Sequence, residues 1–293
     1  MEIFLFSRPE ATHTPEELQG LTCELDMHFP GAWKANRDFA AKLGRPYDAY
    51  DVIESGKPGE SSIAVSYGGD GTFLDCVRMA AGSGVPILGV NSGRLGFLAT
   101  VPKEDLGGAL KDLKTGRFTI EERSTLRAAG DFEKQPAYPF AFNEFSIQRG
   151  GAGMIAVETF VDGQMVATYW GDGAMISTPS GSTAYGLSVG GPVLVPGCEC
   201  FVISPIAPHN LTMRPVVIPN KSEVTFRVLA RGEKPYATLD NQTFPIVDGA
   251  RFTLSKAKNS TKLVRLQNIS FYDTLRNKMM WGIDRRDETK QGS

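Results

Sequence analysis

The sequence predicts an α/β N-terminal domain with a parallel sheet, followed by a β-rich C-terminal domain. In residues 1–120, short apolar strands alternate with helices of about ten residues, which is typical of a parallel sheet covered on both faces. In residues 121–267, apolar residues recur at a period of two, which is typical of strands with one buried face. Residues 268–293 return to helical spacing, and periodicity alone leaves their packing partner open.

The first domain is expected to alternate between strands and helices, with Gly44 and Gly116 ending two of the helices. Ligands of such sheets bind beyond the carboxyl ends of the strands, where Asp70 and Asn91 lie. Strands are expected at Ile3–Phe6, Ile63–Ser66 and Val85–Val90, and helices at Trp33–Leu43, Phe73–Ala81 and roughly Glu104–Lys114.

The second domain is expected to consist of short strands joined by turns. Asp162-Gly163, between apolar flanks, predicts a hairpin turn, and the polar stretch 256–262 predicts another turn. In the tail, Phe271, Leu275, Lys278 and Met279 share one face of a helix. Strands are expected at Arg117–Ala128, Ala141–Gln148, Met154–Val161, Ser222–Ala230 and Ala250–Ser255.

Composition excludes several classes of protein. Of the 293 residues, 41% are apolar and 22% charged, and the net charge is −2, so the basic surface of a nucleic-acid binder is not expected. No apolar stretch approaches the roughly 18 residues of a membrane helix, and the N-terminus lacks a signal peptide's basic segment. The four cysteines and three histidines have neither disulfide-framework nor zinc-site spacing. We therefore expect a protein of the reducing cytoplasm, without nucleic-acid or membrane partners.

The stretch GGDGT, residues 68–72, joins an expected strand to an expected helix. Such a turn exposes backbone N–H groups to a phosphate, yet Asp70 brings a negative charge. The loop lacks the lysine of a Walker loop, and Leu74 stands where a Rossmann fingerprint has its third glycine. Asp70 or Thr72 could simply cap the helix. The functional alternative is that Asp70 faces a substrate hydroxyl, or a divalent metal, beside phosphates.

The stretch FNEFSIQ, residues 142–148, places two polar residues in an apolar strand. One polar neighbour is expected from strand alternation alone. Asn143 and Glu144 together, at the strand's end, would also suit the diol of a ribose.

The longest cluster runs from Gly171 to Pro196 and is crowded with glycines and hydroxyl groups. Residues 179–183 form a turn of Pro, Ser, Gly and Thr, and Tyr185 offers an aromatic face beside it. Asp172 lies between two glycines, so a buried ion pair is not expected there. A loop with a Ser/Thr cap would explain Thr183 but leaves the other small polar residues without a role.

These three clusters, in this order, resemble the NAD kinase family over roughly residues 62–282. GGDGT alone also resembles the loops of diacylglycerol-type lipid kinases and phosphofructokinases, whereas the 171–196 cluster is specific. The resemblance implies an α/β domain of residues 1–120 and 268–293, rejoined by the C-terminal segment, and a β-rich NAD-binding domain of residues 121–267. Supporting stretches are GVNSGRLGFLA (89–99), ISPIAPHNLTMRPVVIP (203–219) and YDTLRNKMMWG (272–282).

The resemblance also implies roles for individual residues. Asp70, with Gly71 beside it, would take the proton from the adenosine ribose 2′-hydroxyl of NAD as that oxygen attacks the γ-phosphoryl group of ATP. Gln242 stands where the family usually has Asp-Gly-Gln, with Asn241 in place of the glycine, and Trp170 departs from the polar residue of many relatives. NAD-binding residues would be Asn143, Glu144, Asp172, Gln242 and the run Thr183, Ala184, Tyr185, Gly186, Leu187 and Ser188.

The implied reaction is phosphorylation of NAD by ATP to give NADP and ADP, with Mg²⁺ or Mn²⁺ expected to accompany ATP. Few lysines lie near the clusters, so a metal is the natural neutraliser of phosphate charge, and Asp70 could instead be its ligand. The family usually forms dimers and tetramers, so a homodimer or homotetramer is expected. The alternative functions are a lipid kinase and a non-catalytic NAD-binding regulator. The sequence leaves open whether NAD or NADH is the preferred acceptor, and whether ATP or polyphosphate is the donor.

Overall fold

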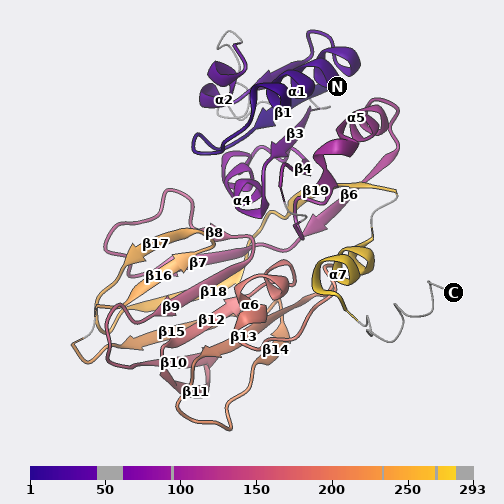
Figure 1. The fold of residues 1–293 in the computed structure, drawn as a ribbon. Helices are drawn as coiled ribbons and strands as arrows, with labels where there is room; N and C mark the ends of the chain where they lie inside the picture. Colours follow the sequence, from indigo (N-terminus) through magenta and orange to yellow (C-terminus); the bar gives the residue numbers. More distant parts are fainter. Residues whose placement is uncertain (45–61, 94–95, 233, 268–269, 282–293) are drawn as a thin grey trace, which may run out of the picture. The chain divides into compact units, whose positions relative to one another are not determined.

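The computed structural model describes residues 1–44, 62–93, 96–232, 234–267 and 270–281. The chain divides into two compact units (Figure 1): Met1–Glu121 with Lys262–Ser293, and Glu122–Thr261. The chain crosses from one unit to the other within strands β6 (Phe118–Arg123) and β19 (Thr261–Leu266), both in the sheet of the first unit. The expected tail segment 268–293 is described only at 270–281; its remaining residues, and Arg94 and Leu95 of the 89–99 stretch, lie outside the described residues.

The first unit is built on a sheet with the strand order β2-β1-β3-β4-β19-β6, and β5 pairs with β4. Strands β1 to β5 run parallel where they pair, with Phe6 opposite Ser66 and Tyr67 opposite Val90. This register brings the carboxyl ends of β1, β3 and β4 together at one edge. The bounds are β1 (Glu2–Phe6), β2 (Trp33–Ala35), β3 (Ser62–Tyr67), β4 (Ile87–Asn91) and β5 (Val101–Pro102).

The helices of the first unit bury apolar side chains against this sheet. Leu25 of α1, Phe39 of α2 and Leu110 of α5 belong to the same buried cluster as the strand residues Ile3 and Val65. A capping box of Thr14 and Glu17 begins α1. The described helices are α1 (Pro15–His28), α2 (Arg37–Lys42), α4 (Asp70–Met79), α5 (Leu106–Lys114) with the preceding short 3₁₀ turn η1 (Lys103–Asp105), and α7 (Phe271–Met279).

The helix expected at Trp33–Leu43 is wrong in its first part. Trp33–Ala35 form strand β2, paired in parallel with Ile3–Leu5, and the helix begins only at Arg37. Asn36 separates the two elements: its Oδ1 accepts the N–H of Ser7 at 3.0 Å, and its Nδ2 donates to the carbonyl of Ser7 at 3.1 Å. Pairing with β1, a long-range interaction, therefore overrides the local helical spacing.

The second unit consists of two antiparallel sheets, with the orders β11-β10-β15-β18-β7-β8 and β14-β13-β12-β9-β16-β17. The hairpin expected at Asp162-Gly163 is confirmed, because both residues have positive φ (50° and 77°) between β10 and β11. The bounds are β7 (Leu126–Gly130), β8 (Phe140–Ala141), β9 (Glu144–Gln148), β10 (Ile155–Val161), β11 (Gln164–Gly171), β12 (Gly173–Ser177), β13 (Cys200–Ile206), β14 (Val216–Pro219), β15 (Val224–Leu229), β16 (Tyr236–Leu239), β17 (Gln242–Pro245) and β18 (Arg251–Lys256).

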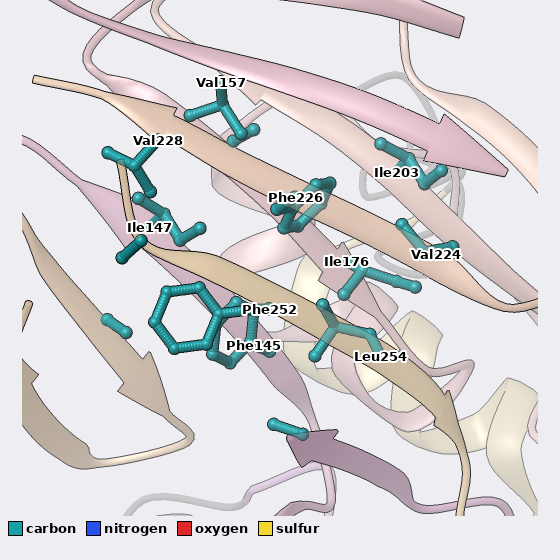
Figure 2. Packing of buried hydrophobic residues seen from close by; sticks show 14 of the residues in the cluster. Phe145, Ile147, Val157, Ile176, Ile203, Val224, Phe226, Val228, Phe252 and Leu254 are labelled. Atoms are coloured by element: carbon teal, nitrogen blue, oxygen red, sulfur yellow. The ribbon is translucent and has the colours of Figure 1, made fainter. Parts of the chain in front are cut away.

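The core of the second unit lies between its two sheets (Figure 2). Phe145 of β9 meets Phe252 of β18 with ring centroids 5.3 Å apart, and Phe226 of β15 stacks on Phe145 at 6.3 Å. Each such buried aromatic side chain stabilises the fold by roughly 1.5–3 kcal/mol. Because side chains alternate along β9, burying Phe145 and Ile147 turns Glu144, Ser146 and Gln148 to the opposite face of the sheet.

These two units confirm the predicted fold class of an α/β domain, a β-rich domain and a C-terminal segment that returns to the first. Helix α7 supplies that segment: it belongs to the first unit, and its residues Thr274 and Leu275 are buried. No helix among the described residues is long and apolar enough to cross a membrane. All four cysteines are free thiols.

Candidate active site

The GGDGT loop connects the carboxyl end of β3 to helix α4, as the sequence predicts. Gly68 has a φ of +156°, and a Cβ at this position would lie 2.4 Å from Oγ1 of Thr72, so the turn requires glycine. The Gly68 N–H donates to the carbonyl of Val90 at 2.9 Å, which ties the loop to the end of β4. Asp70 is the first residue of α4, and its negative charge is favourable at this end of the helix dipole.

The carboxylate of Asp70 is held by three consecutive backbone N–H groups. Phe97 donates to Oδ2, and Leu98 and Ala99 donate to Oδ1, each at 3.0 Å. A carboxylate has about four lone-pair positions, so these contacts leave room for one more partner. The side chain of Asp70 is 32% exposed and can therefore still reach a ligand. Asp70 is not the cap of α4, because Gly69 is the N-cap and no side chain caps this helix; the Asp70 carboxylate instead organises the loop that follows β4.

Two cationic side chains border this loop, and neither was recognised as a site residue from the sequence. Arg8 follows the carboxyl end of β1, and a Cβ built on Gly71 would lie 3.0 Å from its Nη1. Arg8 also forms an ion pair with Asp75, which in turn accepts from Arg78 at 2.9 Å. Lys278 of α7 lies with its Nζ 3.5 Å from Oδ2 of Asp70. The position of Arg8 just after a strand was a usable signal, whereas nothing local pointed to Lys278.

In the second unit, Asp240 organises the Asn143-Glu144 pair. Its Oδ1 accepts the N–H groups of Asn143 (2.7 Å) and Glu144 (3.1 Å), and its Oδ2 accepts that of Phe142 (2.7 Å). The Asp240 N–H donates to the carbonyl of Glu144 at 3.0 Å, and its φ of 51° places it in the hairpin between β16 and β17. Asp240 was not predicted as a site residue, although Asp-Asn between two strand-like runs is a turn signal.

Asn143 and Glu144 each carry a buried polar atom without a hydrogen-bond partner among the described residues. These atoms are Oδ1 of Asn143 and Oε2 of Glu144. Burial, followed by the nearby charge of Asp240, raises the pKa of Glu144 to about 8, against a hydrogen bond from the Tyr185 backbone that lowers it. At neutral pH the protonated carboxyl group can both donate and accept a hydrogen bond, and so can a hydroxyl group of a ribose. Burying a polar atom without a hydrogen-bond partner lowers the stability of the fold, so strand alternation alone does not explain these two residues.

Many hydroxyl groups of the 171–196 cluster serve the turn itself. Thr178 donates to the carbonyl of Phe142 at 2.7 Å, Ser182 to that of Pro179 at 2.7 Å, and Thr183 to that of Ser180 at 3.3 Å. The alternative of a Ser/Thr cap at Thr183 does not hold, because neither the 3₁₀ turn η2 (Ser180–Thr183) nor α6 (Tyr185–Ser188) has a side-chain cap and the Thr183 hydroxyl donates to a carbonyl. The candidates lie in and after η2: Thr183 ends it, Ala184 follows, and Tyr185, Gly186, Leu187 and Ser188 form α6.

Tyr185 joins a polar network on the outer face of the β9 sheet. Its hydroxyl donates to Oε1 of Gln148 at 3.4 Å, and the hydroxyl of Tyr236 donates to the same atom at 3.2 Å. Gln148 also donates to Oγ of Ser146 at 2.9 Å, and Ser146 lies 2.6 Å from Oγ1 of Thr238. This face, shared with Glu144, is therefore lined by polar groups of fixed orientation.

The remaining two candidates lie apart from the buried pair. Asp172 forms an ion pair with Arg149 at 2.6 Å and is 41% exposed, in line with the expectation that it is not a buried pair. Gln242 is paired with Leu239 across the β16–β17 hairpin. Because Leu239 points into the core, Gln242 shares the core-facing side of the sheet, opposite to Glu144.

Asp70 and Gly71 thus belong to the first unit, and all the other candidates to the second. Within the described part of the chain, no group of three or more His, Cys, Asp or Glu side chains is placed to hold a metal ion.

A glycine loop at the carboxyl edge of a parallel sheet, with a fixed carboxylate at the start of the following helix, is typical of α/β proteins that act on phosphate-bearing ligands. Residues 6–118 match the family model of the ATP-NAD kinase N-terminal domain, and residues 142–266 that of the C-terminal domain. The chain belongs to the NAD kinase family. It is an ATP-dependent kinase that phosphorylates the adenosine ribose 2′-hydroxyl of NAD to give NADP and ADP.

Individual relatives agree with this assignment. An NAD kinase of Bacteroides fragilis is 42% identical over 228 residues, covering 78% of this chain and 79% of the relative. An NAD kinase of Cytophaga hutchinsonii is 38% identical over 230 residues, with the same two coverages. The resemblance inferred from the three clusters is therefore confirmed, and the lipid kinase alternative is excluded.

Two solved structures share the fold at lower identity. Yeast NADH kinase complexed with NADH superimposes with a TM-score of 0.83 at 20% identity, covering 97% of this chain and 89% of the yeast chain. An NAD kinase from Archaeoglobus fulgidus in complex with ATP gives a TM-score of 0.73 at 23% identity, covering 96% and 99%. These likenesses support the fold assignment.

Proposed function

We propose that Asp70 is the base of the reaction. The observation that carries this proposal is the carboxylate that three backbone N–H groups hold in place while it stays partly exposed. As the 2′-oxygen bonds to the γ-phosphorus of ATP, the bond from that phosphorus to the β,γ-bridging oxygen breaks. The 2′-hydroxyl proton passes to Asp70, and ADP leaves. A fixed orientation favours this transfer, because the base must lie within about 2.6–3.2 Å of the hydroxyl.

The dinucleotide is proposed to bind to Asn143 and Glu144 of the second unit. Their unpartnered buried atoms, Oδ1 and Oε2, are suited to the hydroxyl groups of a ribose. Further contacts are proposed for Gly71, Asp172 and Gln242 and for the run Thr183, Ala184, Tyr185, Gly186, Leu187 and Ser188. Support for the run comes from the polar network that holds Tyr185 over the same face of the sheet as Glu144. Turnover with NAD and with NADH, measured separately, reports which dinucleotide is preferred.

The phosphoryl donor is proposed to be ATP complexed with Mg²⁺ or Mn²⁺, with the metal entering as part of the substrate. Mg²⁺ is usually held by one or two carboxylates together with substrate phosphates, so a site of several protein ligands is not required. The oxygens of Asp70 are largely engaged by backbone N–H groups, which favours the role of base over that of metal ligand.

The active protein is proposed to be a cytoplasmic homodimer or homotetramer. Two edge strands carry exposed apolar side chains, Met165 and Val166 on β11 and Val216 and Val217 on β14, and such edges favour self-association. Light scattering at micromolar concentration should report a multiple of 31.8 kDa, and dilution should lower the specific activity. A fully active sample with the mass of one chain contradicts this proposal.

The decisive experiment for the base is Asp70→Asn, assayed with ATP and with polyphosphate, and with NAD and NADH separately. Turnover should fall by about 10²-fold or more, since general-base catalysis typically contributes 10²–10⁴. Affinity for NAD, measured by calorimetry, should change little. Asp38→Asn, in the first turn of α2 and exposed, is the matched control and should keep full activity. Turnover of Asp70→Asn within a few-fold of the wild type refutes the role of Asp70 as base. A wild-type protein that forms no NADP contradicts catalytic activity itself.

A further inference from the structure

Lys278 is the described cation nearest to the carboxylate of Asp70. Its Nζ lies 3.5 Å from Oδ2 of Asp70 and 4.8 Å from the centroid of the Phe97 ring. Phe97 also donates its backbone N–H to Oδ2. The ammonium group is therefore positioned by both partners, through charge on one side and through a cation–π contact on the other.

Stabilising the fold is a poor explanation for this lysine. Charge-assisted hydrogen bonds to carboxylates usually measure about 2.7–2.9 Å, so the 3.5 Å separation is long, and Asp70 already accepts three N–H groups. The side chains of Lys278 and Asp70 are 34% and 32% exposed, and exposed pairs contribute only about 0–1 kcal/mol. An ammonium group has three donors, and one carboxylate oxygen with one ring face does not use them all.

We propose that Lys278 binds the γ-phosphoryl group as it moves from ATP to the 2′-oxygen of NAD. This inference rests on the proposed role of Asp70. A hydroxyl that gives its proton to Asp70 lies within about 3 Å of the carboxylate, and the phosphorus it attacks lies about 3–3.5 Å beyond. An ammonium group 3.5 Å from the same carboxylate is within reach of that phosphoryl group's oxygens.

In this arrangement Lys278 keeps its protons throughout and neutralises charge. Negative charge on the equatorial oxygens is what the site must stabilise while the new O–P bond forms and the bond to ADP breaks. The proton of the 2′-hydroxyl still goes to Asp70. The C-terminal helix thereby gains a role in the chemistry, because α7 supplies the charge that the residues around GGDGT lack in sequence.

The first test is Lys278→Met, which keeps an unbranched side chain against Phe97 but removes the charge. We expect kcat to fall by about 10²–10³-fold, as for the loss of one charge-stabilising donor, while KM for NAD changes by less than a few-fold. Lys278→Arg should restore a large part of kcat, which a merely structural defect would not predict. Arg276→Met is the matched control, since Arg276 lies on the same helix and pairs only with Asp273 among the described residues. A Lys278→Met enzyme within a few-fold of wild-type kcat overturns the proposal.

The second test separates Lys278 from the role of Asp70. A non-hydrolysable ATP analogue with Mg²⁺ is titrated into Asp70→Asn and into the double variant Asp70→Asn/Lys278→Met. If Lys278 binds phosphate, the double variant should bind the analogue at least about 10-fold more weakly; equal affinities overturn its role. High turnover of Asp70→Asn alone would overturn the role of Asp70 as base. The affinities for the ATP analogue would still test whether Lys278 binds phosphate.

Discussion

Gly96 and Asp70 approach so closely that a Cβ built on Gly96 would lie 1.9 Å from Oδ1 of Asp70. No side chain fits between the two, so the three N–H groups of residues 97–99 reach the carboxylate only because residue 96 is glycine. The resemblance stretch 89–99 contains this glycine, but its partner 26 positions earlier is visible only in the fold.

Gly96→Ala should therefore displace the carboxylate of Asp70. We expect turnover to fall by about 10-fold or more, since small displacements of catalytic groups are costly. The free energy of unfolding should fall by about 1–3 kcal/mol for a buried N–H left without its acceptor. Gly108→Ala, in α5, is the matched control, because nothing lies within 4 Å of a Cβ there. NADP formation and urea unfolding measure the two effects, and equal behaviour of both variants contradicts the contact.

Glu144→Gln should make stability less dependent on pH. The pKa of Glu144 is raised from 4.5 to about 8, so between these values the folded state holds a proton that the unfolded state releases. Stability contributed by this group is therefore lost as pH rises through the window, at up to about 1.4 kcal/mol per pH unit. The free energy of unfolding of Glu144→Gln, relative to that of the wild type, should therefore rise from pH 5 to pH 8. Above pH 8 the difference should become constant.

Thermal unfolding at pH 5, 6.5, 8 and 9 measures this difference. The exposed Glu223→Gln controls for the loss of a surface carboxylate. A constant difference between Glu144→Gln and the wild type across the series means that Glu144 is charged in the folded protein at neutral pH.

Asp240→Asn should weaken NAD binding, because the Asp240 carboxylate holds the backbone of Asn143 and Glu144. An amide has one oxygen in place of two, so the N–H of Phe142, Asn143 or Glu144 loses its acceptor. We expect an affinity loss of about 10-fold, with a destabilisation of about 1–3 kcal/mol. Asp248→Asn, whose carboxylate accepts the N–H of Ala230 in another turn of the same unit, should be destabilised without this loss of affinity.

Asn143→Ala should separate binding from stability. Oδ1 of Asn143 is buried without a partner among the described residues, so its removal should leave the free energy of unfolding unchanged or raised. Affinity for NAD should fall by about 0.5–1.5 kcal/mol for the loss of one neutral hydrogen bond. Calorimetry on this variant and on Asp172→Ala tests both proposed contacts. If affinity is unchanged in both variants, these residues do not bind the dinucleotide.

The sequence by itself determined those features that are encoded locally. Glycine turns, apolar strands such as Ile63–Ser66 and the Asp162-Gly163 hairpin follow from the allowed backbone angles and the period of apolar residues, so pattern alone predicts them. The three clusters, in order, also sufficed for the family, because each keeps chemistry-bearing residues close together along the chain.

Only the tertiary structure decided which distant residues meet. Strand β2 formed from residues with helical spacing because pairing with β1 satisfied its backbone. Asp240 reached the Asn143-Glu144 pair across the β9–β16 pairing, and Lys278 reached Asp70 because α7 lies in the first unit. The contacts of Asp240 with Glu144 and of Lys278 with Asp70 span 96 and 208 positions of the chain, well beyond the few residues over which a local pattern carries information. The fixed carboxylate of Asp70, the buried neutral Glu144 and the nearby Lys278 all depend on packing. Only the folded core removes water from Glu144 and places the charge of Lys278 beside that of Asp70.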